Sequence, residues 1–324
     1  RGSSLLMKIL FTADWHIKLG QKNVPEAWAR ERYLKFFSDI HDIEKTVDLH
    51  IIGGDLFDRV PSMGELELFF DFISGTEVRT LVYDGNHEAT KKHKTFLTQL
   101  KKASKEVNSR IEIIDSIHNE DHFGVLPYRE LHGNWHVTDF NPRKPLFTHV
   151  RGAIPPHVTP EVDLKRFEPF PVVFAGDLHS HKNTQLNLVY PGSPMTTSFH
   201  RTVVDTGYIL IDTDTADWTW HKFELPQLIR KLVSSEQDML PTDYHHTIYE
   251  LEGDIADLSL VANSELLDKK LIKRKTEAVL ILDKEMSIED ELVEYLTYIL
   301  ELETDNVTDI LGTFHDYSKN FTVG

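Results

Sequence analysis

The stretch Leu49-His50-Ile51-Ile52-Gly53-Gly54-Asp55-Leu56-Phe57-Asp58 contains the pattern on which the fold depends. A short apolar run, residues 46–52, ends in glycines and is followed by acidic residues, as in a buried β-strand that presents polar side chains at its carboxyl end. The pattern recurs four times: residues 8–12 end before Asp14, residues 78–83 before Asn86, residues 145–148 before His149, and residues 171–175 before Gly176-Asp177. Because the carboxyl ends of parallel strands meet at one edge of a sheet, we expect a ligand site there.

Helix-like segments separate the first three of these strands. Residues 26–45 and 63–74 carry apolar residues three and four positions apart, the spacing of an amphipathic helix. Alternating strands and helices predict an α/β fold with a largely parallel sheet. A hairpin of residues 207–212 and 218–223 is expected to close this first domain.

The chain is expected to divide into one large domain and two smaller segments. We set aside residues 1–6, because Arg1-Gly2-Ser3-Ser4 resembles a cloning remnant and Met7 is the expected native start. Residues 7–225 form the predicted main domain, and residues 285–324 are predicted to form acidic helices. The small domain between them, residues 226–284, is predicted to contain a helical segment at 227–233, a strand at 247–252, a helix at 255–273 and a strand at 278–283.

Composition excludes several classes of protein. The chain has 35 Lys and Arg against 52 Asp and Glu, a formal charge of −17, and no cysteine. Without cysteine there is no disulfide and no thiolate metal site, so a metal would be held by His, Asp, Glu or Asn. No apolar run reaches about 18 residues, so we expect no membrane-spanning segment and a cytoplasmic location. The negative charge argues against a protein that coats nucleic acid by electrostatics alone.

Three short motifs, each following a predicted strand, contain the candidate metal-binding and catalytic residues. They are D-x-H at Asp14-Trp15-His16, G-D-x-x-D at Gly54-Asp55-Leu56-Phe57-Asp58, and G-N-H-E at Gly85-Asn86-His87-Glu88. A single Asp or His at a strand end usually caps a turn, but the three motifs in this order predict oxygen and imidazole ligands around metal ions. His149 and the segment Gly176-Asp177-Leu178-His179-Ser180-His181 can supply the remaining ligands.

These motifs resemble those of the calcineurin-like metallophosphoesterases. Within that superfamily the chain resembles the SbcD (meiotic recombination eleven) DNA double-strand break repair nucleases, and among them bacteriophage recombination exonuclease subunits. Tyr190-Pro191-Gly192-Ser193-Pro194 is similar to the Y-P-G-S-P or Y-C-G-S-P that follows the last ligands in these nucleases. The resemblance covers residues 7–225 and, more loosely, the small domain. It implies a four-layer α/β/β/α sandwich with a small α/β capping domain and C-terminal helices.

The resemblance also implies two divalent metal ions, Mn²⁺ or alternatively Mg²⁺. One ion would be held by Asp14, His16, Asp55 and a late histidine, and the other by Asp55, Asn86, His149 and the remaining late ligand. The last family motif, G-H-x-H, fits this chain in two registers. If Gly176 stays aligned, the ligands are Asp177 and His179, whereas a shift by two residues makes them His179 and His181. We favour the first register, because a carboxylate suits these metals and the glycine at the strand end sets the geometry.

Catalytic and DNA-contacting residues follow from the same resemblance. His87 corresponds to the acid near the leaving group, and the carboxylate of Asp58 would orient it, although Asp58 could simply cap a turn. Arg59 is a candidate phosphate contact. A basic stretch with Lys91, Lys92 and Lys94 could contact DNA phosphates or form an ordinary solvated face.

The leading hypothesis is a two-metal DNA exonuclease or endonuclease subunit. It would hydrolyse phosphodiester bonds with an SbcC-like ATPase in DNA recombination, repair, replication or degradation, in a bacterium or a phage-infected host. The alternatives are a phosphomonoesterase or cyclic-nucleotide phosphodiesterase, and a scaffold with a degenerate centre, since Asp177 stands where the family has His. A homodimer is implied, and residues 63–72 could form its interface or face the core. Given the charge, we expect the subunit alone to bind DNA weakly and with strong salt sensitivity.

Overall fold

The computed structural model describes residues 7–91, 94–213, 215, 217–272, 287–300, 302 and 304–321. The chain forms two compact units, which are described separately. The first comprises Arg1–Leu251 and Val261–Lys270, and the second comprises Glu252–Leu260 and Leu271–Gly324. The division at residues 225/226 and 284/285 stays a prediction.

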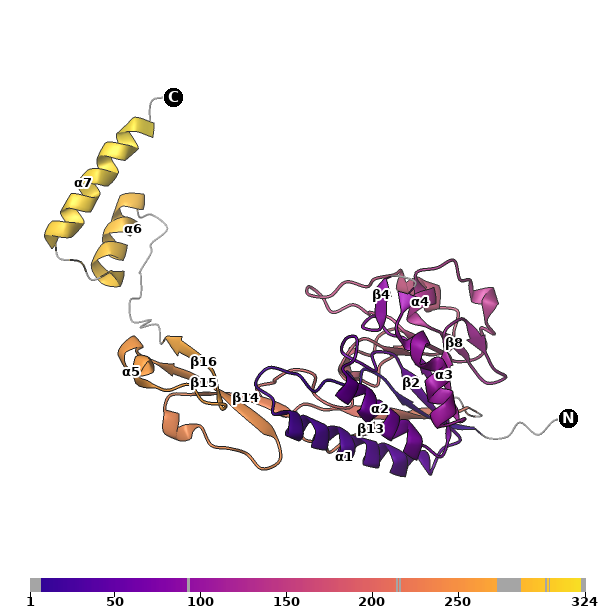
Figure 1. Cartoon of the computed structure of the whole chain (residues 1–324). Coiled ribbons are helices and arrows are strands. Elements are labelled where there is room, and N and C mark those ends of the chain that lie inside the picture. The colour runs from indigo at the N-terminus through magenta and orange to yellow at the C-terminus, as the bar shows by residue number, and fades with distance from the viewer. Residues whose placement is uncertain are drawn as a thin grey trace. The chain divides into compact units, whose positions relative to one another are not determined.

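A six-stranded sheet forms the first layer of strands in the first unit (Figure 1). Its order is β13 (Trp218–Lys222), β12 (Gly207–Asp212), β1 (Lys8–Thr12), β2 (Leu49–Gly53), β3 (Arg79–Tyr83) and β6 (Ile111–Ile114). The strands from β1 to β6 in this order are parallel, whereas β12 is antiparallel to both β1 and β13. The predicted hairpin and the first three predicted strands are therefore confirmed.

A second sheet contains the two remaining predicted strands. Its order is β11 (Leu188–Val189), β10 (Val173–Gly176), β9 (Leu146–His149), β8 (Gly124–Leu126) and β7 (His118–Asn119). The strands β8 to β11 are parallel, and β7 is antiparallel to β8. The predicted α/β/β/α sandwich requires this second sheet, although the apolar runs identified only the strands and not the sheet that they join.

The two sheets pack face to face through aromatic side chains. Phe11 from β1 lies with its ring centroid 5.2 Å from that of Phe147 on β9 and 6.0 Å from that of Phe174 on β10. All three side chains are fully buried, and each contributes roughly 1.5–3 kcal/mol by burial. This contact holds the carboxyl ends of both sheets at a common edge.

Helices cover the outer face of the first sheet, and shorter segments cover the second. The first group is α1 (Glu26–Glu44), α2 (Met63–Gly75) and α3 (Leu97–Val107), which share a buried core with the sheet. Over the second sheet lie the short helix α4 (Tyr128–Leu131) and 3₁₀ turns. The predicted α/β/β/α sandwich is confirmed, with a thin fourth layer.

Helix α2 faces the core. A capping box of Ser62 and Glu65 fixes its start, and Leu68, Phe69 and Phe72 are fully buried. These side chains therefore pack inside the subunit. Of the two interpretations of residues 63–72, a dimer interface or a core-facing helix, the burial agrees with the core-facing helix.

A three-stranded sheet in the order β14 (Leu228–Val233), β15 (His246–Gly253) and β16 (Leu267–Ile272) follows the sandwich in sequence. The predicted helix at 227–233 is wrong, because β14 pairs in parallel with β15 along its whole length and buries Leu228 and Ile229. Among the described residues of the predicted helix at 255–273, those of α5 (Ile255–Leu260) are helical, and the last ones form β16 instead. The predicted strand at 278–283 lies outside the described residues.

The C-terminal segment is helical, as predicted. Helix α6 (Ile288–Glu294) begins at a capping box of Ser287 and Asp290 and continues into the π-helical turn η5 (Tyr295–Ile299). Helix α7 (Thr304–Phe321) follows. Among the helices that the structure describes, none combines the length and apolar character needed to cross a bilayer.

Candidate metal centre

The loops after β1 and β2 lie side by side at the carboxyl edge of the first sheet. The N–H of Asp14 donates to the carbonyl of Gly54 (3.0 Å), and the N–H of His16 donates to that of Asp55 (2.9 Å). Asp14, His16 and Asp55 all have positive φ, at 58°, 45° and 49°. Such a conformation costs about 1–3 kcal/mol in a residue other than glycine, so the surrounding hydrogen bonds must impose it. The result is that three polar side chains gather at one place.

The second sheet contributes His149, the last residue of β9. Its Nδ1 lies 2.9 Å from the carbonyl oxygen of Gly53, across the sandwich. Since a carbonyl only accepts, Nδ1 carries a hydrogen, so in the neutral imidazole the lone pair is on Nε2. That Nε2 atom lies 3.5 Å from Oδ2 of Asp55 and 2.9 Å from Oδ1 of Asn86. The tautomer is therefore the one that a metal ligand needs.

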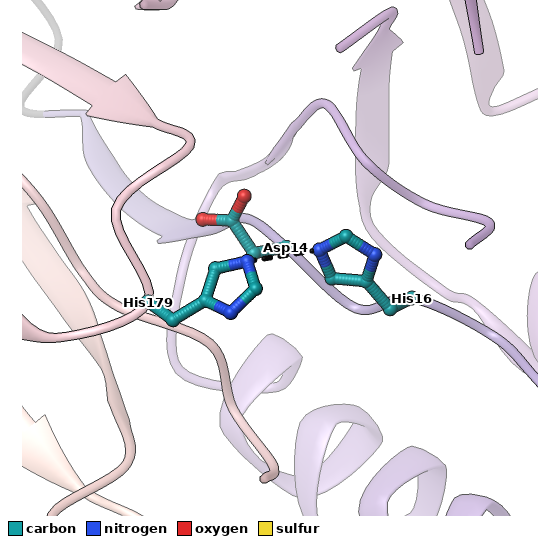
Figure 2. Close-up of side chains that lie close together, drawn as sticks. All are labelled: Asp14, His16 and His179. Carbon is teal, nitrogen blue, oxygen red and sulfur yellow. Dashed lines mark hydrogen bonds between the residues drawn. The ribbon is translucent and has the colours of Figure 1, made fainter. Parts of the chain in front are cut away.

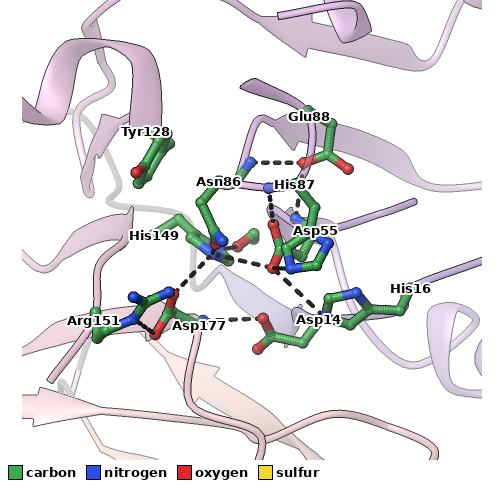
Figure 3. Close-up of polar contacts among 12 residues, drawn as sticks. Asp14, His16, Asp55, Asn86, His87, Glu88, Tyr128, His149, Arg151 and Asp177 are labelled. Atoms are coloured by element: carbon green, nitrogen blue, oxygen red, sulfur yellow. Dashed lines mark hydrogen bonds and ion pairs between the residues drawn. The ribbon is translucent and has the colours of Figure 1, made fainter. Parts of the chain in front are cut away.

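Asn86 places its amide oxygen among other acceptors. The position of Oδ1 lies 3.2 Å from both Asp177 Oδ1 and Asp55 Oδ2, besides its contact with His149 (Figure 3). Acceptors that converge in this way are stabilised either by the Asn86 amide turned so that its NH2 group donates to them, or by a cation that lies among them while the amide oxygen faces it. Carboxylate, amide and imidazole donors are ligands of divalent metal ions, so this set fits such an ion.

A second group of ligand atoms comes from Asp14, His16 and His179. The Nε2 atoms of the two histidines lie 3.0 Å apart, and the three residues offer ligand atoms within 4.8 Å of one another (Figure 2). Oδ2 of Asp14 is buried without a hydrogen-bond partner among the described residues. A buried orphan oxygen beside two imidazoles is also well matched to a cation.

Asp55 lies between the two groups. Its Oδ2 is 3.5 Å from Nε2 of His16 on one side and 3.5 Å from Nε2 of His149 on the other. A single carboxylate in this position can contact two ions at once.

The electrostatics follow from burial of several acidic groups together. Burial, with Asp55 and Asp177 nearby, raises the pKa of Asp14 to about 8. Burial alone would lower the pKa of His149, but the carboxylates of Asp55, Asp14 and Asp177 outweigh it and raise that pKa to about 9. Burial, followed by the neighbouring His179 and His87, lowers the pKa of His16 well below its usual value. The buried carboxylates are therefore stabilised by nearby positive charge, which divalent cations would supply when bound.

His87 lies beside this cluster, in T-shaped contact with His16. Its Nδ1 lies 2.6 Å from the backbone carbonyl of Asp58, whereas the Asp58 carboxylate pairs with Lys18 (2.8 Å). We expected the carboxylate to orient His87, and the structure shows the main-chain carbonyl there instead. The physical reason is that Lys18 offers the Asp58 carboxylate a full positive charge.

His181 points away from the cluster. Its Nδ1 lies 2.7 Å from the carbonyl of Tyr190, and its ring stacks on Trp220. Of the two registers, the structure brings together the residues of the first, Asp177 and His179.

Of the candidate DNA contacts, Arg59 is the one whose side chain the structure describes. Nη2 of Arg59 donates to the buried carboxylate of Glu65 (3.1 Å), at the start of α2. Lys91 ends β4 (Ala89–Lys91) and Lys94 begins β5 (Lys94–Thr95), but their side chains lie outside the described part of the structure, as does all of Lys92.

Residues 7–179, more than half of the chain, match the family described as calcineurin-like phosphoesterase. The chain belongs to this family. It is also 39% identical over 327 residues to "Probable exonuclease subunit 1" of Escherichia phage T5, an alignment that covers 97% of this chain and 100% of the relative.

Solved structures resemble this phosphoesterase more distantly. An archaeal phosphodiesterase has 14% identity and a TM-score of 0.39, covering 67% of this chain and 100% of its own. A protein of Thermus thermophilus has 15% identity and a TM-score of 0.40, covering 67% of this chain and 99% of its own.

Glu88 supports the centre of this phosphoesterase, although the sequence motifs assigned it no role beyond its place in G-N-H-E. It is fully buried and accepts the backbone N–H groups of Asp55 (3.0 Å), Phe57 (2.9 Å) and Gly85 (2.8 Å). One carboxylate thus ties the loop after β2 to the loop after β3. Burial, with Asp55 nearby, raises the pKa of Glu88 to about 8.

The Tyr190-Pro191-Gly192-Ser193-Pro194 segment supports the same phosphoesterase loops from another side. The hydroxyl of Tyr190 donates to the carbonyl of Val150 (3.0 Å), next to His149, and Oγ of Ser193 donates to the carbonyl of Asp14 (2.7 Å). Gly192 has φ of +78°, and a Cβ there would lie 2.9 Å from the carbonyl oxygen of His179. Glycine is therefore required at this position.

Proposed function

We propose that this chain is the SbcD-like nuclease subunit of a complex that hydrolyses DNA phosphodiester bonds. The observation that carries the proposal is the place of Asp55, with one oxygen 3.5 Å from an imidazole nitrogen of each ligand group. The relative in phage T5 is named as an exonuclease subunit, and the identity extends along nearly the whole chain. The cellular role that fits is recombination, repair or degradation of DNA.

The proposed ligand set divides into two overlapping groups. One ion would contact Asp14, His16, Asp55 and His179, and the other Asp55, Asn86, His149 and Asp177. When bound, two divalent ions supply an activated water and neutralise charge on the phosphate. We propose Mn²⁺, with Mg²⁺ as the alternative.

His87 is the proposed acid for the leaving oxygen. Its Nδ1 is committed to the carbonyl of Asp58, so Nε2 is the atom that can hold and release a proton. Nε2 lies 3.9 Å from Oδ2 of Asp55, and 38% of the side chain is exposed. The ring is thus fixed beside the cluster and still reachable by a substrate.

The test is an assay of the metal-loaded full chain on linear DNA, on a phosphomonoester and on a cyclic nucleotide. We expect hydrolysis of DNA at a rate that exceeds the other two, and loss of both bound ions and activity in Asp55→Asn. If the small substrates are hydrolysed and DNA is not, the chain is instead a phosphomonoesterase or a cyclic-nucleotide phosphodiesterase. Two bound ions without hydrolysis of any substrate would contradict the proposal.

A partner ATPase of the SbcC type is part of the proposal, because the T5 relative is named as a subunit. The acidic segment with α6 and α7 is the proposed docking element, and a homodimer would form through the main domain. Truncation after residue 283 should abolish complex formation with the ATPase and retain metal-dependent nuclease activity. With a charge of −17, DNA binding by the isolated subunit should weaken steeply between low and moderate salt.

A further inference from the structure

Arg151 contacts the candidate metal centre by binding the carboxylate of Asp177. It lies two residues beyond His149 in the loop after β9, and its guanidinium meets the carboxylate of Asp177 with two bonds (Figure 3). Nε lies 3.1 Å from Oδ2 and Nη2 lies 3.2 Å from Oδ1. One edge of the guanidinium is therefore anchored on a residue of the ligand cluster.

The backbone of Arg151 is also held in place. Its N–H donates to Oε1 of Glu161 (3.1 Å), while Oε2 of Glu161 accepts from the hydroxyl of Tyr128 (2.9 Å) and lies 3.2 Å from Nε2 of His132. Glu161 thereby ties the Arg151 loop to α4. Both ends of the arginine are fixed, so little side-chain freedom remains to be lost when the guanidinium binds a ligand.

The other edge of the guanidinium is open. The side chain of Arg151 is 42% exposed, and within the part of the chain that the structure describes its Nη1 makes no hydrogen bond or ion pair. Arg59, which follows Asp58 in the loop after β2, differs, because its Nη2 contacts Glu65 and its Nη1 lies 3.8 Å from Asp58. Lys18 is likewise committed to Asp58 at 2.8 Å. Of these three cations, Arg151 is thus the one whose carboxylate partner belongs to the ligand cluster, and its Nη1 remains available to an anion.

We propose that Arg151 is a substrate-binding residue, which takes a non-bridging oxygen of the scissile phosphate through Nη1 while its opposite edge stays on Asp177. This inference rests on the proposed function, since it assumes that a phosphodiester lies at the metal centre. A guanidinium has five N–H donors in a planar fork and can hold a carboxylate and a phosphate at once. A lysine offers one point charge and cannot serve both partners in this geometry.

The test uses the metal-loaded full chain and two probes: inorganic phosphate for binding, measured by calorimetry, and bis(p-nitrophenyl) phosphate for KM and kcat. Arg151→Ala should raise the Kd for phosphate and the KM by about 10- to 100-fold, as expected for loss of a charge-assisted hydrogen bond. Arg151→Lys should recover only a small part of that loss. Both variants should keep two metal ions by elemental analysis.

Arg79→Ala is the matched control. Arg79 also has a 42% exposed side chain and pairs with a carboxylate, that of Glu120, but it begins β3 at the opposite end of the sheet from the centre. This variant should bind phosphate like the wild type.

Phosphate binding by Arg151→Ala at the wild-type Kd would overturn the inference. Loss of a metal ion from that variant would also overturn it, because Arg151 would then serve to hold Asp177. The proposed function fails separately: a wild type that binds phosphate through Arg151 and hydrolyses no phosphodiester refutes the nuclease and leaves Arg151 as a phosphate-binding residue only.

Discussion

The backbone N–H of Asp177 donates a 3.0 Å hydrogen bond to Oδ1 of Asp14. Asp177 follows β10 of the second sheet and Asp14 follows β1 of the first, so this bond joins the carboxyl ends of the two sheets (Figure 3). This bond uses one oxygen of Asp14, and the other, Oδ2, is buried without a hydrogen-bond partner among the described residues. The candidate metal centre is therefore formed by the packing of the two sheets. We expect substitutions of different residues around it to affect metal binding, catalysis and stability separately.

The choice of the late histidine can be tested directly. His179→Ala should lose one of two bound ions, because Nε2 of His179 lies with Asp14 and His16. His181→Ala should keep both ions and lose only some thermal stability, because its ring packs on Trp220. Elemental analysis of the two purified variants gives the answer, and the reverse pattern would favour the register shifted by two residues.

His87→Ala should separate acid catalysis from metal binding. We expect both ions to remain and kcat on DNA to fall by about 10²–10⁴-fold, the usual contribution of a general acid. Hydrolysis of bis(p-nitrophenyl) phosphate should fall much less, since p-nitrophenolate leaves without a proton. Equal losses on the two substrates would show that His87 does not protonate the leaving oxygen.

Glu88→Gln should weaken metal binding without removing a ligand. The amide can no longer accept all three backbone N–H groups that the carboxylate accepts, so the loops carrying Asp55 and Asn86 lose a common support. We expect metal affinity to fall by about 10–100-fold, as for other supporting residues of metal sites. A Mn²⁺ titration measures this change, and Glu112→Gln, at an exposed position on β6, serves as the control.

The stability of the metal-free protein should fall as the pH rises from 7 to 9. In the folded chain the pKa of Asp14 is raised from 3.8 to about 8, that of Glu88 from 4.5 to about 8, and that of His149 from 6.5 to about 9. A raised pKa means that the folded state binds the proton more tightly, so its stabilising effect is lost as the pH rises through the folded value. The pKa of His16 is lowered below its usual 6.5 in the folded chain, so its titration changes the free energy of unfolding only below pH 6.5, outside this range.

Calorimetry with a chelator and with saturating Mg²⁺ measures this effect. The Tm of the chelated protein should drop across the range, and the Tm of the metal-loaded protein should change less, because the ions replace the protons. A chelated Tm that stays constant or rises from pH 7 to 9 would contradict the assignment of these buried groups.

Five strands of the two main sheets, the hairpin, the helices α1 and α2 and the polar motifs that follow the strands were predictable from the amino-acid sequence. These features depend on residues that are close in sequence. An apolar run of four or five residues, such as that before Asp14, can be recognised without knowing which strands pair with it. Local pattern was insufficient at residues 227–233, where pairing of β14 with β15 overrode a helix-like sequence.

Tertiary structure alone decided how those pieces combine. It divided the strands between two sheets, brought Asp177 and His179 to the cluster while His181 faces Tyr190, and put the carbonyl of Asp58 rather than its carboxylate against His87. It also brought Arg151 onto Asp177, 26 positions away in the chain. Each of these outcomes depends on distances between residues far apart in sequence, which are fixed only when the two sheets pack and the strained loops at their edge are held by hydrogen bonds.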